Sequence, residues 1–210
     1  MFSKDEPRIG VVIGTGPSLT KDQIEKVSHL KKFGANRAFE FDVDVLHGCN
    51  WQFWEHYWPQ IKDLRCHKWT TRPELNGKYP GLHYIEERWE DGLSTDPGYI
   101  CAHHGTGPQC VNLALHYGCK VILLIGWDMR FPGKVDRYHY TGKRRFFGGD
   151  ALTEKHWPMT GSNGELSGLI REMETIRPED YGIEIINCTP DSAMKCFPMM
   201  PLDEALKLYG

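Results

Sequence analysis

The chain alternates short apolar runs with segments in which apolar residues recur every three or four positions. The clearest run is Val121–Ile125, and a nearly continuous one covers residues 9–13. Such runs, bounded by turn residues, are typical of strands that are buried on both faces. The apolar positions at 24–30 instead have helical spacing, with Ser18 or Thr20 as the expected N-cap. A strand, a glycine-rich turn and a helix therefore open the chain.

The rest of the pattern repeats this alternation. We expect strands over 33–41, 43–46, 66–71, 82–85 and 183–186, and helices over 51–64, 109–117, 165–176 and 202–208. Strands that alternate with helices predict an α/β fold, with a mostly parallel, Rossmann-like sheet and helices on both faces. A length of 210 residues fits one domain over 1–210.

Residues 130–158 show no sustained period and are rich in glycine, basic and aromatic residues. Loops of this length are uncommon unless they serve a site. We therefore expect a lid-like loop in this region.

The composition narrows the functional classes. A net charge of −3 argues against a protein built around duplex nucleic acid, which needs a basic excess. The polar N-terminus lacks the features of a signal peptide, and the longest apolar run is too short for a membrane span, so we expect a cytoplasmic protein. Seven cysteines, an odd number without a CxxC pair, favour buried thiols over disulfides or a zinc site.

The turn Gly14-Thr15-Gly16-Pro17-Ser18 follows the first strand directly. Glycine allows a ligand to approach the backbone closely, and a helix N-terminus offers amide hydrogens to an anion. The turn lacks the third glycine of the dinucleotide fingerprint and the Gly-Lys-Ser/Thr ending of a P-loop. We interpret it as a candidate phosphate or ribose-phosphate site, the alternative being a tight turn without a ligand.

A second turn, Gly105-Thr106-Gly107, opens another helix, and Asp128 ends the central strand. Open α/β sheets bind ligands at the carboxyl edge, where these segments would meet. An aspartate there can hold a ribose hydroxyl, orient a basic side chain or bind Mg²⁺, or it can simply cap a turn.

Histidines lie in loops near the predicted edge, and basic residues lie in the expected lid. His103, His104, His139 and His156 are candidates for proton transfer near neutral pH, although a single histidine of this kind is more often a surface residue or one with satisfied hydrogen bonds. Basic side chains of the lid match phosphate oxygens, or they form a solvated face; these are Arg137, Lys143, Arg144 and Arg145.

The order of these motifs resembles the bacterial sialyltransferases that use CMP-sialic acid. Those enzymes open with Gly-Asn-Gly-Pro-Ser-Leu, and later carry an asparagine near aromatics, Thr-Ser-Gly, Gly-Ile-Asp-Phe and Cys-Pro-Asn-Ser. The similar segments here are Gly14–Leu19, Asn36 with Phe39, Gly105–Gly107, Gly126–Met129 and Thr189–Ser192. Thr15 replaces the asparagine of the opening motif, and its hydroxyl has a shorter reach to a phosphate.

The chain also resembles the 6-hydroxymethylpterin diphosphokinase-like proteins, which share the opening motif and have Gly-Gln-Asp-Leu where this chain has Gly126–Met129. The two resemblances imply a nucleotide-dependent transferase. The favoured version is a glycosyltransferase-like enzyme that uses a nucleotide-activated sugar of the CMP type. A Mg²⁺-dependent diphosphokinase with Asp128 as metal ligand is the alternative, and a nucleotide-binding sensor without catalysis is the third.

The favoured version assigns roles to residues. Gly14, Thr15, Gly16, Pro17 and Ser18 would hold the phosphate and ribose, and Asn36 and Thr106, between Gly105 and Gly107, would contact the base or sugar hydroxyls. Arg144 or Arg145 would steady the leaving phosphate, and His156, with His139 as its rival, would take the proton of the acceptor. The partner is thus a small-molecule nucleotide donor; the acceptor and any homo-oligomer are left open.

Overall fold

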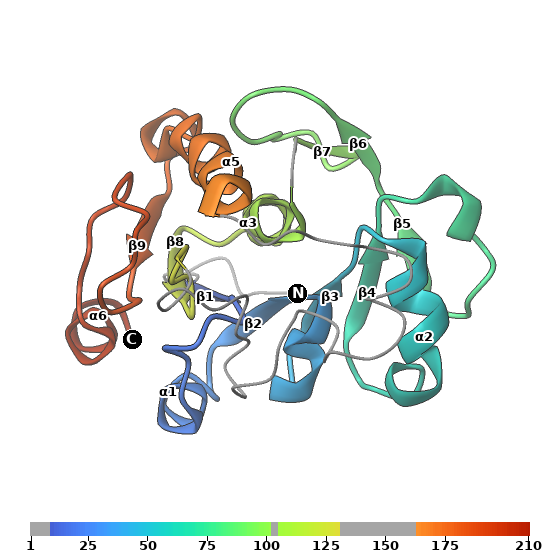
Figure 1. The fold of residues 1–210 in the computed structure, drawn as a ribbon, viewed down its shortest axis with the longest axis horizontal. Helices are drawn as coiled ribbons and strands as arrows, with labels where there is room; N and C mark the ends of the chain where they lie inside the picture. Colours follow the sequence, from blue (N-terminus) through green and yellow to red (C-terminus); the bar gives the residue numbers. More distant parts are fainter. Residues whose placement is uncertain (1–8, 102–104, 131–162) are drawn as a thin grey trace.

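The computed structural model describes residues 9–101, 105–130 and 163–210. Seven parallel strands form one sheet in the order β5-β4-β3-β2-β1-β8-β9 (Figure 1). The strands are β1 (Ile9–Ile13), β2 (Lys31–Ala35), β3 (Val45–His47), β4 (His67–Thr70), β5 (Leu82–Tyr84), β8 (Val121–Ile125) and β9 (Glu184–Asn187). The fold is therefore α/β and Rossmann-like, as the alternation of strands and helices predicts.

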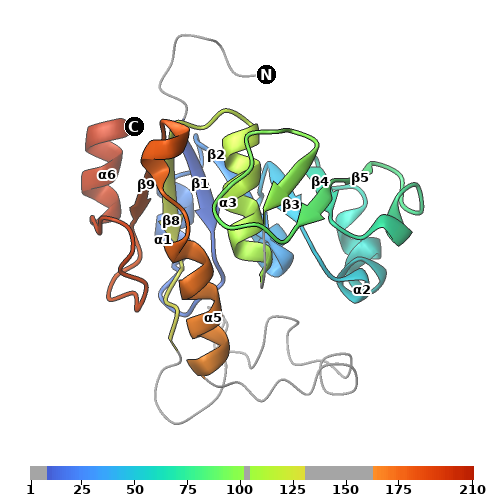
Figure 2. The ribbon, with the colours of Figure 1, turned by 90° about the horizontal axis from the view of Figure 1, so that it is seen from above.

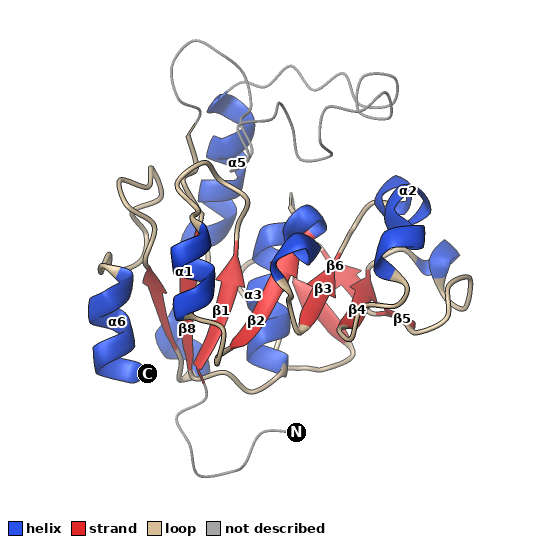
Figure 3. Ribbon diagram, turned by 90° about the horizontal axis from the view of Figure 1, so that it is seen from below, coloured by secondary structure: helices blue, strands red, loops and turns tan. Residues whose placement is uncertain are grey.

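Helices cover both faces of the sheet (Figure 3). One face carries α3 (Thr106–His116) and α5 (Asn163–Glu174), and the other carries α1 (Lys21–Lys26), α2 (Trp51–Ile61) and α6 (Leu202–Tyr209). Three 3-10 helices, η1 (Asn36–Phe41), η2 (Pro73–Leu75) and η3 (Pro178–Tyr181), complete the described connections. No helix in these residues is long and apolar enough to cross a membrane.

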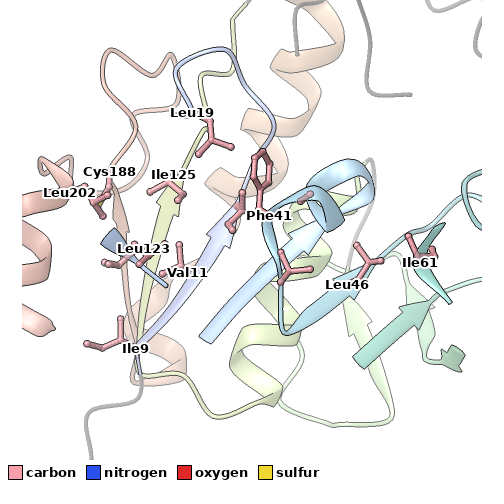
Figure 4. Close-up of a cluster of buried hydrophobic side chains, with 14 of the residues drawn as sticks. Ile9, Val11, Leu19, Phe41, Leu46, Ile61, Leu123, Ile125, Cys188 and Leu202 are labelled. Atoms are coloured by element: carbon pink, nitrogen blue, oxygen red, sulfur yellow. The ribbon is translucent and has the colours of Figure 1, made fainter. Parts of the chain in front are cut away.

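The two faces have separate hydrophobic clusters because side chains alternate along each strand. Val11 and Leu123 belong to the cluster beneath α1, α2 and α6 (Figure 4), whereas Val12 and Leu124 pack against α3 and α5. Central strands that are buried throughout explain why β1 and β8 appear in the sequence as apolar runs.

A ribbon of two short parallel strands, β6 (Glu86–Arg88) and β7 (Tyr99–Cys101), lies beside α3 (Figure 2). Asn112 of α3 holds it there: its Oδ1 accepts the N–H of Ser94 at 2.9 Å and that of Cys101 at 3.0 Å, and its Nδ2 donates to the Ser94 carbonyl. The side chain is fully buried. Asn112 therefore fixes the ribbon to α3 through three hydrogen bonds of its side chain.

The structure differs from the expected elements in two places. The strand expected over 33–41 ends at Ala35, because Asn36 adopts φ of 51° and the chain continues as η1. The strands β6 and β7 were not expected, since Glu86–Arg88 is polar throughout and carries no apolar period.

The order of the strands places a topological switch point between β1 and β8. From β1 the chain adds β2 to β5 on one side, and then returns to add β8 and β9 on the other. The connections that follow β1 and β8 therefore leave in opposite directions at the carboxyl edge, the place where open parallel sheets form a ligand crevice.

Candidate functional site at the switch point

The turn after β1 is bonded directly to the end of β8. The Gly14 N–H donates to the Ile125 carbonyl at 2.8 Å, and the Gly16 N–H donates to the Gly126 carbonyl at 2.9 Å. The two chain segments that flank the switch point thus form one unit.

This close approach explains the glycines. A Cβ on Gly14 would lie 2.4 Å from the Gly126 carbonyl oxygen, and one on Gly16 would lie 2.0 Å from Oδ2 of Asp128. The Gly126 carbonyl oxygen would also lie 2.7 Å from a Cβ on Gly16, so a side chain at either position would collide with the backbone that follows β8. Contacts within the chain therefore account for both glycines, which the sequence alone linked to the approach of a ligand.

Asp128 is turned toward the same turn. Its carboxylate accepts the Ser18 hydroxyl at 2.8 Å and the Ser18 N–H at 3.2 Å. The next residue, Met129, adopts φ of 51°, which is uncommon for a side chain of this kind and marks local backbone strain. Asp128 thus supplies a negative charge at the switch point and orients Ser18.

The start of α1 decides between the two expected N-caps. Thr20, not Ser18, is the N-cap: its hydroxyl accepts the Gln23 N–H at 3.2 Å, and the Gln23 side chain accepts the Thr20 N–H at 2.9 Å. This capping box satisfies amide groups that the sequence analysis assigned to an anion. The roles of Thr15 and Pro17 toward a ligand stay predictions.

The indole of Trp127 lies between the two glycine turns. A Cβ on Gly14 would be 3.0 Å from its Cδ1, and a Cβ on Gly107 would be 2.9 Å from its Cη2, at the far end of the ring. Its Nε1 donates to the Val12 carbonyl at 3.0 Å. The turn after β1 and the start of α3 therefore flank a single ring.

Residues 189–192 form hydrogen bonds with the backbone of Trp127. The Trp127 N–H donates to the Thr189 hydroxyl at 2.9 Å, and the Ser192 hydroxyl donates to the Trp127 carbonyl at 2.5 Å. Both side chains are buried. The sequence marked this segment only by resemblance, and the contacts give it a positioning role.

Asn36 brings β2 to the start of α3. Its Nδ2 donates to Oγ1 of Thr106 at 3.4 Å, and Sγ of Cys49 lies 2.9 Å from the same oxygen. The Oδ1 of Asn36 is buried and has no hydrogen-bond partner among the described residues. Exchange of the amide atoms would only move the unpaired position from oxygen to nitrogen. Native structures rarely leave such a group unpaired, which points to a partner beyond the described residues.

A chain of polar side chains that no sequence motif indicated continues this edge beneath α3. Nδ1 of His47 lies 2.9 Å from the Trp69 carbonyl, Nε2 lies 2.5 Å from Oε1 of Gln109, and Nε2 of Gln109 donates to Glu87 at 3.0 Å. His47 is fully buried, and this burial lowers its pKa to about 4. The one signal in the sequence is a histidine at the end of a buried strand.

Arg72 and Cys49 lie at the outer end of this edge. The Nε of Arg72, which follows β4, donates to the Cys49 carbonyl. Burial raises the pKa of the Cys49 thiol, so the thiol is neutral near pH 7 and acts here as a hydrogen-bonding group rather than as a nucleophile.

Several predicted site residues lie outside the described residues. These are His103, His104, Arg137, His139, Lys143, Arg144, Arg145 and His156, with nearly all of the expected lid. The described residues do unite Gly14, Gly16, Ser18 and Asp128 in one unit, and Asn36 with Thr106 in another. Within the same ranges no group of three or more His, Cys, Asp or Glu side chains could hold a metal ion.

Comparison of the chain with protein-family models, with curated proteins and with solved structures finds no match.

Proposed function

We propose that the protein is a nucleotide-dependent transferase, glycosyltransferase-like, which uses a nucleotide-activated sugar of the CMP type. The observation that carries the proposal is the unpaired Oδ1 of Asn36. Asn36 follows β2, next to the switch point, at the position where Rossmann-type sheets place the group that accepts a ribose hydroxyl. A ribose hydroxyl or a base amino group would supply the missing donor.

The other roles follow from the same placement. Thr106 lies within reach of Asn36 and would contact the same nucleoside. Thr15 and Ser18 would face the phosphate, with Ser18 oriented by Asp128. Arg144 or Arg145 would neutralise the leaving phosphate, and His156 would take the acceptor proton; together they provide what displacement at an anomeric carbon requires.

The diphosphokinase alternative needs Mg²⁺ with Asp128 as a ligand. The Asp128 carboxylate is already bonded to Ser18, and the described residues add no cluster of carboxylates around it. We therefore rank this alternative second. EDTA should leave transfer unchanged under the favoured proposal and abolish it under the alternative.

A thermal-shift panel of CMP, UDP, GDP, ADP, ATP and pterins tests the proposal. A nucleotide at 100 times its Kd stabilises the folded state by about 2.7 kcal/mol, which raises the Tm of a chain of this size by about 5–10 °C. We expect the shift with CMP. A shift with ATP and magnesium alone favours the kinase, and no shift with any nucleotide contradicts all three hypotheses.

The role of Asn36 is tested by Asn36→Gly, which removes the amide while glycine tolerates φ of 51°. Loss of one hydrogen bond should weaken CMP binding about tenfold. Asp42→Gly is the matched control, because Asp42 is exposed and has φ of 53° at the other end of η1. Calorimetric titration with CMP should separate the two variants; equal affinities would remove Asn36 from the site.

A further inference from the structure

The chain from His47 through Gln109 to Glu87 has a hydrogen acceptor at each end. At one end is the Trp69 carbonyl, which only accepts, so Nδ1 of His47 carries a hydrogen and donates it. At the other end is the Glu87 carboxylate, which also only accepts when ionised. Three hydrogen bonds link these ends, and the His47 ring and the Gln109 amide between them have to donate the hydrogens for all three.

A neutral His47 and an ionised Glu87 cannot supply them. If the amide of Gln109 donates to Glu87, its oxygen faces Nε2 of His47, which then needs a second hydrogen. If the amide is turned round, it donates to Nε2, and its oxygen faces Glu87, which then needs a hydrogen. Both orientations of the amide thus require one additional proton.

We propose that His47, Gln109 and Glu87 together hold this additional proton at neutral pH, and that Glu87 exchanges it with a ligand in the crevice. The proposal rests on the proposed function only for the identity of that ligand. Because His47 is fully buried, a charged ring is disfavoured. The proposal therefore turns the Gln109 amide round from the placement given above, so that it donates to Nε2 of His47 and the proton lies at the Glu87 end. The titration belongs to the whole unit rather than to one residue.

The position of Glu87 suits such an exchange. It is half-buried, and none of the ion pairs in the described residues includes it. It lies near Cys49, whose thiol contacts Thr106 beside the unpaired Asn36. In the exchange, the O–H bond of Glu87 breaks, the proton passes to a ligand oxygen, and water later returns a proton to the carboxylate.

Other charged or titratable groups around the unit come from five elements. Cys49 after β3 lies near both Glu87 and Arg72, which follows β4, and Cys110 of α3 lies beside Cys49. On the strand of Glu87 itself, Glu86 and Arg88 pair with each other at 2.8 Å. The exposed His83 of β5 lies against the Trp69 ring, with the ring centroids 5.1 Å apart and the planes tilted by 40°.

The substitution Glu87→Gln tests the proton count without any nucleotide. An amide at position 87 donates to Gln109 and completes the chain with a neutral His47 and no additional proton. In this variant, His47 takes up a proton only on unfolding, so the stability it contributes is present above pH 6.5 and is lost as the pH falls toward 4. Its unfolding equilibrium constant should rise about 25-fold between pH 7 and pH 5 from this residue.

The wild type should show no such rise from these groups, because its folded chain already holds a proton in that range. Urea unfolding from pH 5 to pH 7 measures the difference, with Glu90→Gln, at an exposed position beyond the end of β6, as the control that should parallel the wild type. Parallel curves for the wild type and Glu87→Gln would overturn the proposal.

If Glu87→Gln does not fold, a second measurement, made on the wild type, still tests the proposal. The infrared spectrum of the wild type at pH 6, with and without ¹³C-labelled glutamate, should contain the carbonyl band of a protonated glutamic acid. Its absence contradicts the inference. Failure of every nucleotide in the binding panel would defeat the proposed function and leave both proton measurements unaffected.

Discussion

Replacing Gly14 by alanine should destabilise the fold by about 3 kcal/mol and abolish CMP binding. The added Cβ would lie 2.4 Å from the Gly126 carbonyl oxygen and 3.0 Å from the Trp127 ring. Both obstacles are rigid. The carbonyl follows the end of β8, and the buried Trp127 is held at its ring by the Val12 carbonyl and at its backbone N–H by Thr189. The turn would therefore have to leave the switch point. Thermal unfolding should show a Tm lower by about 6–12 °C.

Gly168→Ala is the control for this substitution. Gly168 lies in α5, and a Cβ there would meet nothing within 4 Å. Alanine in a helix is more favourable than glycine, so the variant should be unchanged or more stable by up to about 1 kcal/mol. If Gly14→Ala matched Gly168→Ala in stability and kept CMP affinity, the close contact between the β1 and β8 turns would not exist in solution.

The second large effect is expected at Asn112. Asn112→Leu keeps the branched shape of the side chain but leaves the buried N–H groups of Ser94 and Cys101 without their acceptor. Each unpaired group costs about 1–3 kcal/mol, so the variant should lose about 4 kcal/mol of stability. Chemical denaturation gives the total loss, and hydrogen exchange at the amides of Ser94 and Cys101 locates it in the β6–β7 ribbon.

The same chemical change at Asn76 provides the comparison. Asn76 is exposed, and only its backbone N–H has a partner in the described structure. Asn76→Leu should change stability by no more than about 0.5 kcal/mol. Similar losses at positions 112 and 76 would show that Asn112 does not hold the ribbon. Because the ribbon carries Glu87, Asn112→Leu should also disturb the His47–Gln109–Glu87 chain.

The sequence predicts the sheet well because its strands are buried on both faces. Val121–Ile125 and residues 9–13 are apolar on every or nearly every position, and a parallel sheet is the usual place for such runs. Because the strands alternate with helices, the sheet is parallel, and the glycine turns are then predicted to lie at its carboxyl edge. Residues 36–41 escaped this reasoning, since a single left-handed residue, Asn36, ends the strand within an otherwise strand-like segment.

The site was predictable only in part. Residue types at strand ends and helix starts predict which side chains reach one edge. The structure places Asp128 beside Ser18 and Asn36 beside Thr106, while their roles toward a ligand stay predictions. Sequence cannot tell what fills the space beside a glycine: Gly14 and Gly16 are required by Gly126 and Asp128, more than a hundred positions away. The same holds for His47, Glu87 and Gln109, which three separate segments bring together.

The measurement that tests the central claim most directly is a ¹H–¹⁵N spectrum of the protein titrated with CMP. The account predicts that the largest shifts fall on the amides of residues 14–16, 18, 36 and 105–107, which would place the nucleotide at the switch point between β1 and β8. Shifts confined to other parts of the sheet, such as β9 and α6, would contradict it.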